Sequence, residues 1–311
     1  MFAVVQWLYV NVNVYVGYFR LSCQAVHVIA TGFTGVIGLA VLNDKMYVSC
    51  SGNQRIAVYS PTTFNFQQYL HCRCSHCGYH SESVISQCGC TGNRNRHRFP
   101  YTHTYQLKHF IVACDVNNCI YVATTSHINE IAIGQNNTLS RWSIGNAPLS
   151  LSITTSQSLL VAFSNTSFLE EYSLQGQSLR QINLQPARIT SPVYAVQLSD
   201  HQFAVTHHQP THGFSIVNSD GRLIRSYGGN AGDVNQPQEI AVDQRGRMFV
   251  ADQGNNRILV TGPKTQSLSA YPLQLPANCT LDGPHSIHFD AVNNRIYVGE
   301  WNGGKILCCQ L

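Results

Sequence analysis

Short apolar runs separated by polar turns recur along this chain, and the clearest set spans residues 236–260. Three apolar runs, at residues 239–242, 248–251 and 257–260, alternate with turns at 243–246 and 253–256. The runs are rich in β-branched and aromatic residues, whereas the turns are rich in Asp, Asn and Gly. This pattern predicts three short strands in an antiparallel meander.

The same order of runs and turns appears again at residues 284–308 and 38–59. Fainter copies of the repeat can be found by aligning the chain on the valine of the second apolar run. These valines are Val48, Val122, Val161, Val205, Val250 and Val298. Successive valines are separated by about 40–50 residues, except that the gap between Val48 and Val122 is about 30 residues longer. No segment has a sustained helical period. The chain is therefore predicted to be an all-β, six-bladed β-propeller with four-stranded antiparallel blades.

The two ends of the chain are expected to meet in one blade. The last copy stops after its third strand at Leu311, so its blade lacks an outer strand. Residues 24–30 precede the first strand of blade 1 at about the distance that separates the outer strand of one blade from the inner strand of the next, so we expect them to complete the last blade and close the ring. Residues 24–311 then form a single propeller domain, and residues 1–23 are a leader to which no role is assigned.

A segment rich in cysteine and histidine, residues 71–103, interrupts the repeat between blades 1 and 2. Its cysteines are Cys72, Cys74, Cys77, Cys88 and Cys90. Thiolates at this density could hold a structural zinc ion, although only Cys74 and Cys77 have the C-x2-C spacing typical of zinc modules. A variable loop and a set of disulfides are the alternatives. We expect no other cofactor.

Two further cysteine pairs bear on the redox state. Cys114 and Cys119 flank a predicted hairpin turn, so they could pair in an oxidising compartment or remain as buried thiols. Cys308 and Cys309 are adjacent, so their side chains should point to opposite faces of one strand.

The repeat resembles the NHL repeat, whose pattern is P-x-x-I-A-V-D, a turn, a strand ending near V-A-D, and N-x-R-I. The matching residues are Pro237, Ile240, Ala241, Val242, Asp243, Val250, Ala251, Asp252, Asn255, Arg257 and Ile258. The resemblance implies a six-bladed propeller that binds proteins, often in ubiquitin-ligase pathways, or single-stranded RNA. The chain lacks the RING, B-box and coiled-coil modules of tripartite-motif proteins.

Composition favours a protein partner over RNA. The chain has 44% hydrophobic and 11% charged residues, and its formal net charge is only +4. This charge is low for a nucleic-acid-binding surface. The first 19 residues contain neither Lys nor Arg, and polar residues interrupt their apolar run. We therefore expect a cytoplasmic monomer that is not inserted in a membrane, with secretion as the alternative.

The predicted binding surface is the propeller face that carries the turns between second and third strands, because loops on rigid scaffolds commonly carry recognition. Its candidate residues are Asn53, Arg55, His207, His208, His212, Asp252, Asn256, Arg257, Glu300 and Trp301. Trp301 could anchor a partner or pack against the neighbouring blade. Asp252 and Glu300 hold equivalent places in successive repeats, which indicates a structural role for both.

Two enzymatic families are alternatives to a non-catalytic binding platform. Peptide-amidating lyases use a similar propeller with three metal-binding histidines, and His207 and His285 could converge, but no third histidine matches. The gluconolactonase family of hydrolases holds a divalent cation with an acidic and amide cluster. Here Cys50, Thr124 and His207 replace the acidic residue in other repeats, so no ring of carboxylates is built. We therefore predict no catalysis.

Overall fold

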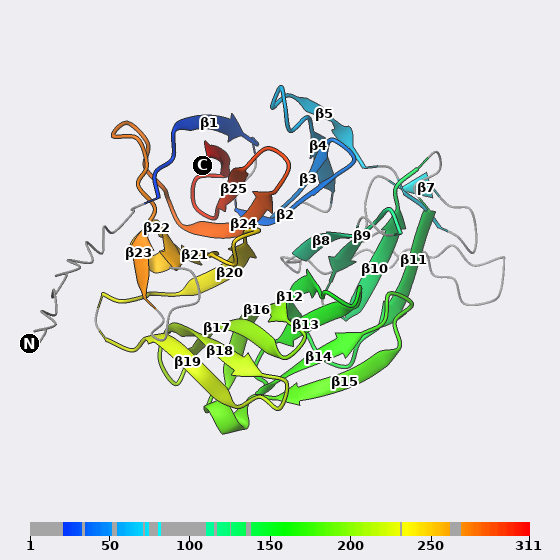
Figure 1. The fold of residues 1–311 in the computed structure, drawn as a ribbon. Helices are drawn as coiled ribbons and strands as arrows, with labels where there is room; N and C mark the ends of the chain where they lie inside the picture. The colour runs from blue at the N-terminus through cyan, green and yellow to red at the C-terminus, as the bar shows by residue number, and fades with distance from the viewer. Residues whose placement is uncertain are drawn as a thin grey trace, which may run out of the picture.

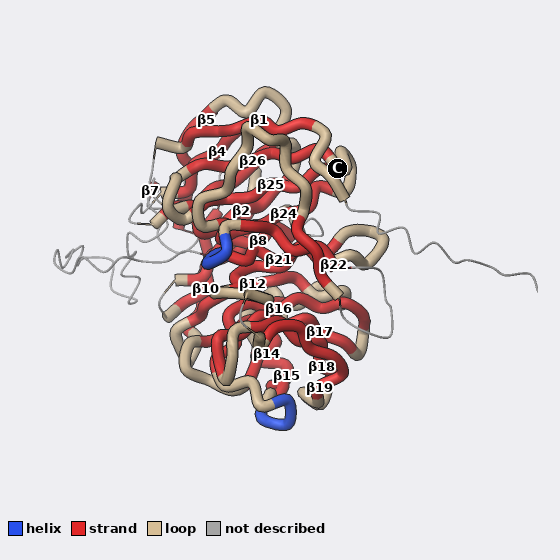
Figure 2. Tube along the Cα trace, turned by 90° about the vertical axis from the view of Figure 1, so that its left-hand side faces the viewer, coloured by secondary structure: helices blue, strands red, loops and turns tan. Residues whose placement is uncertain are grey.

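The computed structural model describes residues 21–32, 35–51, 55–70, 72–74, 80–81, 110–114, 117–124, 126–134, 138–230, 232–261 and 269–311. Within these residues the strands form six sheets arranged as blades (Figures 1 and 2). Blades 1 and 2 comprise β2 (Val36–Leu42), β3 (Lys45–Cys50), β4 (Ile56–Tyr59) and β5 (Phe66–Tyr69), then β8 (Phe110–Cys114), β9 (Cys119–Ala123), β10 (His127–Ala132) and β11 (Thr138–Ser143). Blades 3 and 4 comprise β12 (Pro148–Ile153), β13 (Leu159–Phe163), β14 (Phe168–Tyr172) and β15 (Ser178–Asn183), then β16 (Ser191–Ser199), β17 (Gln202–Gln209), β18 (Gly213–Asn218) and β19 (Leu223–Gly228).

Blade 5 comprises β20 (Pro237–Val242), β21 (Met248–Asp252), β22 (Arg257–Thr261) and β23 (Ala270–Pro272). Blade 6 comprises β24 (Pro284–Asp290), β25 (Arg295–Glu300), β26 (Lys305–Gln310) and β1 (Ala25–Ala30). The innermost strands β2, β8, β12, β16, β20 and β24 each contact the next one, and β24 contacts β2, so the ring is closed. The predicted all-β six-bladed propeller is confirmed. The helical residues in the described part are two single 3-10 turns, Gln185–Ala187 and Gln253–Asn255.

The expected closure of the ring by an N-terminal strand is also confirmed. β1 pairs antiparallel with β26, in a register that runs from Ala25 opposite Gln310 to Ala30 opposite Lys305. A disulfide between Cys23 and Cys309 reinforces this junction, although 286 residues separate the two cysteines along the chain. The ends of the chain are thus joined by strand pairing and by a covalent bond.

Part of the cysteine-rich insertion extends blade 2. β6 (Cys72–Cys74) pairs with the outer strand β11 in parallel, and β7 (His80–Ser81) pairs with β6. Blade 2 is consequently a six-stranded sheet (Figure 1). The remainder of the insertion lies outside the described residues.

Apolar side chains of adjacent blades pack face to face and form the core. The second strands lie deepest, and the six valines that revealed the repeat are at most 2% exposed: Val48, Val122, Val161, Val205, Val250 and Val298. In one cluster, Phe249 of blade 5 packs with Val298 of blade 6, which shows how burial holds neighbouring blades together. Among the described residues, no helix has the length and apolar content needed to span a bilayer.

Polar side chains also join neighbouring blades to one another. Ser152 Oγ of blade 3 donates to the carbonyl oxygen of Ala195 at 2.7 Å, and Thr206 Oγ1 of blade 4 donates to the carbonyl oxygen of Gln238 at 2.8 Å. Glu239 Oε2 of blade 5 accepts the N–H of Ile287 of blade 6 at 3.0 Å. These bonds satisfy polar groups that the channel wall would otherwise bury alone.

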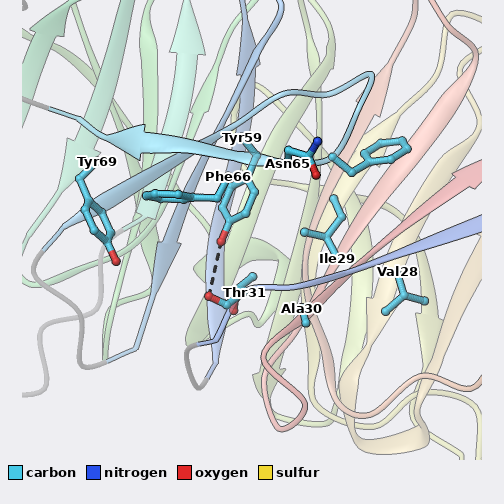
Figure 3. A pocket seen from close by; sticks show the side chains of 9 residues that line it. Val28, Ile29, Ala30, Thr31, Tyr59, Asn65, Phe66 and Tyr69 are labelled. Atoms are coloured by element: carbon cyan, nitrogen blue, oxygen red, sulfur yellow. Dashed lines mark hydrogen bonds between the residues drawn. The ribbon is translucent and has the colours of Figure 1, made fainter.

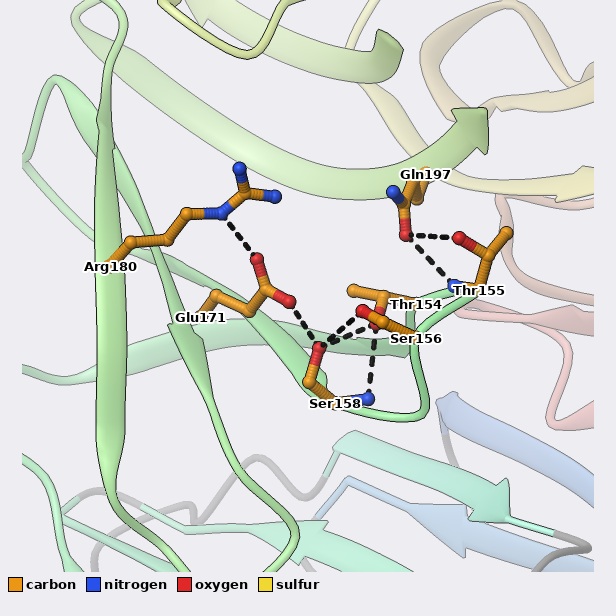
Figure 4. A network of polar contacts seen from close by, with 7 residues as sticks. All are labelled: Thr154, Thr155, Ser156, Ser158, Glu171, Arg180 and Gln197. Atoms are coloured by element: carbon orange, nitrogen blue, oxygen red, sulfur yellow. Dashed lines mark hydrogen bonds and ion pairs between the residues drawn. The ribbon is translucent and has the colours of Figure 1, made fainter. Parts of the chain in front are cut away.

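A polar network lies in blade 3, around the turn between β12 and β13 (Figure 4). The buried carboxylate of Glu171 pairs with Arg180 Nε at 2.6 Å and accepts the hydroxyl of Ser158. In the same turn, Thr155 donates its backbone N–H to Gln197 Oε1 of blade 4 at 2.8 Å. The network therefore fixes the turn between β12 and β13 and ties it to the next blade.

Candidate binding site at the channel mouth

One face of the propeller carries a polar pocket built by four consecutive blades. Antiparallel pairing places the start of each first strand beside the end of each second strand, as in the pairs Pro237–Asp252 and Pro284–Glu300. The pocket encloses about 570 Å³ where these strand ends surround the channel mouth. Its lining residues are Leu149, Ser191, Val193, His208, Gln236, Gln238, Gln253, Gly254, Asn256, His285, Trp301 and Asn302. The face predicted from the sequence therefore does carry a cavity.

Trp301 lies at the rim of this pocket, in the turn after β25. Its backbone N–H donates to the carbonyl oxygen of Gly283 at 2.7 Å, and its indole stacks on the His285 ring with centroids 5.2 Å apart. A Cβ built on Gly35 of blade 1 would come within 3.5 Å of Trp301 Cε3. Trp301 thus packs against the neighbouring blade and lines the pocket, so the two roles considered for it are compatible.

The three histidines of blade 4 that were predicted for the site have different environments. His207 is buried inside the blade, where Nδ1 lies 3.0 Å from the carbonyl oxygen of Thr211 and Nε2 lies 2.9 Å from Ser215 Oγ. Burial lowers the pKa of His207 to about 4, so this ring is neutral at physiological pH. His208 and His285 are the histidines that meet in the pocket.

His212 and its neighbours join blade 4 to the connection that enters blade 5. The backbone N–H of Gln236 donates to His212 Nδ1 at 3.3 Å, and the rings of His208 and His212 are 5.2 Å apart, edge to face. His212 therefore lies beside the pocket and supports Gln236, which lines it.

The buried Asp252 and the partly exposed Arg257 form a clamp beside the pocket-lining residue Gln253. Asp252 Oδ1 accepts the backbone N–H of Asn235 at 2.7 Å, and its Oδ2 pairs with Arg257 Nε at 2.6 Å. Arg257 Nη2 also donates to the carbonyl oxygens of Gly232 and Asp233. The ion pair thus fixes the connection between blades 4 and 5. Both side chains use their polar groups for contacts within the fold.

Glu300 repeats this clamp between blades 5 and 6. Its Oε1 accepts the backbone N–H of Asp282 at 3.1 Å, and the residue is 1% exposed. Burial is the main cause that raises the pKa of Glu300 above its ordinary value. Asn256, by contrast, both fixes a connection between blades and contributes to the pocket. Its Oδ1 accepts the N–H of Gly283, and the residue lines the pocket.

The remaining predicted residues lie away from the pocket or outside the described part. The guanidinium of Arg55 lies over the ring of Tyr69, 5.0 Å from its centroid, on blade 1. Asn53 is outside the described residues. Of the five cysteines proposed for zinc, Cys77, Cys88 and Cys90 are outside them too, while Cys72 and Cys74 contribute backbone to β6. The described residues contain no group of three His, Cys, Asp or Glu side chains arranged to hold a metal.

Sequence reasoning missed the glutamines of the pocket. Gln236 and Gln238 flank the start of β20, and Gln253 follows β21. Gln238 Nε2 donates to Gln253 Oε1 at 2.8 Å. A usable signal existed, since the repeat pattern leaves these positions open and they occur where two strand ends meet.

A second hollow lies at the rim of the disc between blade 6 and blade 1 (Figure 3). It encloses about 390 Å³ beside β1, and the aromatic side chains of Tyr59, Phe66 and Tyr69 face it. Phe66 is 49% exposed. This aromatic groove was not anticipated, because one wall is β1, which completes the last blade, whereas the other wall belongs to blade 1.

Comparisons with known proteins establish the fold. No family model and no curated sequence matches the chain. Virginiamycin B lyase from Staphylococcus aureus superimposes with a TM-score of 0.58 at 12% identity, covering 92% of this chain and 99% of the lyase. The WD40 repeats of RRP9 superimpose with a TM-score of 0.61 at 8% identity, covering 94% and 99%. A protein of unknown function from Bacteroides caccae gives 0.58 at 13% identity, covering 83% and 82%. The chain is similar to these propellers in fold, and the NHL resemblance stays a prediction.

Proposed function

We propose that this protein is a non-catalytic binding platform that captures a protein partner at the channel mouth. The observation that carries the proposal is the 570 Å³ pocket, which four blades build from hydrogen-bonding side chains around the partly exposed Trp301. A cavity of this size with convergent polar groups is typical of binding sites. A tryptophan held in place by packing is the kind of residue that dominates interface energetics.

The composition of the lining supports a protein partner over RNA. None of the lining residues is Lys or Arg, so the pocket offers no cation to a phosphate backbone. The fold likeness to the WD40 repeats of RRP9 is compatible with a binding role, although likeness of this degree concerns architecture alone.

The disulfide supports the secreted alternative for the compartment. Disulfides such as Cys23–Cys309 persist mainly in oxidising compartments. We therefore favour a partner outside the cytoplasm over a partner in a cytosolic ubiquitin-ligase pathway.

A second candidate function is catalysis by histidine, which is favoured by one specific observation. His208 and His285 line the same pocket, and a catalytically inactive histidine-to-alanine variant is known for the lyase of similar fold, in a structure with quinupristin. The test is incubation with quinupristin, followed by chromatography. Consumption of quinupristin that disappears in both His208→Ala and His285→Ala would establish this candidate.

Affinity capture with matched variants tests the binding platform. The immobilised full chain should retain a protein from extracellular fluid or extracts of the source, identified by mass spectrometry. Trp301→Ala and Gln253→Ala should lose that protein, whereas Leu179→Ala, at a 50% exposed position on β15, should keep it. Equal capture by all variants would contradict the proposal, provided that circular dichroism shows each variant folded.

A further inference from the structure

The pocket at the channel mouth has a carboxamide-rich lining without acidic, lysine or arginine side chains. Its twelve residues include no Asp, Glu, Lys or Arg. Five of them carry side-chain amides: Gln236, Gln238, Gln253, Asn256 and Asn302. Each carboxamide offers both donors and an acceptor without charge. The lining therefore suits a ligand that donates and accepts hydrogen bonds and carries no charge of its own.

Gln238 and Gln253 make the clearest hydrogen-bonding surface. Their mutual bond of 2.8 Å joins the start of β20 to the turn after β21 and uses one N–H and one oxygen lone pair. Whichever amide donates, the pair retains free N–H groups and free lone pairs. A peptide group presents the complementary combination of one N–H and one C=O.

The acidic side chains of Asp252 and Glu300, close to the pocket, are buried within the fold. Asp252 is 0% exposed and paired with Arg257. Glu300 is 1% exposed and accepts the backbone N–H of Asp282, whose own carboxylate accepts Asn302 Nδ2 at 2.9 Å. Since no lining residue is Asp, Glu, Lys or Arg, a charged ligand would lose hydration without an ion-pair partner in the lining, which costs free energy.

Aromatic side chains add an apolar contact surface to the hydrogen-bonding groups of the pocket. The stacked rings of Trp301 and His285, inclined at 26°, line the same pocket as the glutamines of blade 5. Such rings accept small apolar side chains or the face of a peptide group. They supply contact area that the amides alone lack.

We infer that the pocket binds an uncharged peptide segment, held through its main-chain amides by Gln238 and Gln253 and through its side chains by Trp301. The inference rests on the proposed function and deepens it by naming the chemistry of the partner's segment. Binding of this kind is insensitive to salt, because no ion pair forms.

Selection from a phage-displayed library of random heptapeptides on the immobilised full chain tests the inference. Peptides selected by the wild type should be depleted in Asp, Glu, Lys and Arg relative to the unselected library. Gln238→Glu keeps the shape of the side chain and adds a negative charge, so it should select peptides that contain Lys or Arg. Gln175→Glu makes the same change at an exposed position in the turn after β14, on the opposite face, and should select the wild-type set.

A synthetic peptide of the selected sequence provides a second measurement. Its Kd should change less than about twofold between low and high salt, and Gln253→Ala should weaken it by about 3–10-fold. Selection of charged peptides by the wild type, identical selection by Gln238→Glu, or no selection at all would overturn the inference. If uncharged peptides are selected but no natural protein is captured, the proposed function fails and the pocket chemistry stands. If a partner is captured through the pocket and the selected peptides are charged, the inference alone fails.

Discussion

Glu239 is a buried acid in the innermost strand of blade 5, and its replacement tests the energetics of the channel wall. The residue is 8% exposed, and burial raises the pKa of its carboxyl group from the ordinary 4.5 to about 8. Its Oε2 accepts the N–H of Ile287, which partly opposes this rise by stabilising the ionised form. Gln can accept the same hydrogen bond, so Glu239→Gln removes the ionisation and preserves the contact.

The sign and size of the effect follow from linkage. Below about pH 4.5 the acid is protonated in both the folded and unfolded states, so it adds no pH dependence. As pH rises the unfolded chain ionises first, and the folded state loses about 1.4 kcal/mol per pH unit until its own pKa near 8 is reached. The ionisation therefore destabilises the wild type by about 3 kcal/mol at pH 7 and about 5 kcal/mol above pH 8.

Urea unfolding of wild type and Glu239→Gln at pH 4, 7 and 8.5 measures this effect. The variant should match the wild type within about 1 kcal/mol at pH 4 and become the more stable protein at the two higher pH values. Glu170→Gln is the control, since Glu170 accepts the hydroxyl of Ser178 at an exposed site and should change stability by less than about 0.5 kcal/mol at any pH. A difference between Glu239→Gln and wild type that does not vary with pH would refute the reasoning.

Three further substitutions test contacts that join neighbouring blades or the two ends of the chain. Cys309→Ser removes the disulfide that ties the two ends together, and it should lower the free energy of unfolding by about 2–5 kcal/mol, measured by urea unfolding against wild type with and without reductant. Asp252→Asn leaves its arginine partner without a counter-charge, so a loss of about 3 kcal/mol is expected, and a loss below 1 kcal/mol would contradict the assigned clamp. Gly221→Ala would place a Cβ 1.6 Å from a backbone carbonyl oxygen of blade 3, whereas Gly232→Ala meets no atom within 4 Å at a similar positive φ. Gly221→Ala should therefore lower Tm far more than Gly232→Ala, and equal Tm values would refute the predicted clash.

The fold could be predicted because the residues that recur in each repeat are the ones that hold the blades together. Asp252 reads as a structural residue from its recurrence as Glu300, and the structure gives both the same task of fixing a connection between blades. The missing outer strand of the last blade follows from counting strands. The Cys23–Cys309 disulfide could not be found in this way, since 286 residues separate its partners and only the closed ring brings them together.

The details of the candidate site were harder to predict, because they depend on register and on positions where the copies differ. His207 and His208 are adjacent, so their side chains point to opposite faces of β17, and a shift of one residue decides which of them reaches the pocket. Gln238 belongs to no conserved pattern of the repeat, and its partner Gln253 lies in a turn of the same blade. Only the folded blade shows that the two amides form one surface.

Hydrogen–deuterium exchange of the full chain, with and without saturating selected peptide, tests the central claim that ligands bind at the channel mouth. The account predicts slower exchange at residues 253–256 and 301–303, which surround the pocket, and unchanged exchange in the turns at 243–247 and 290–294 on the opposite face. Protection confined to the opposite face or to the aromatic groove beside β1 would contradict it.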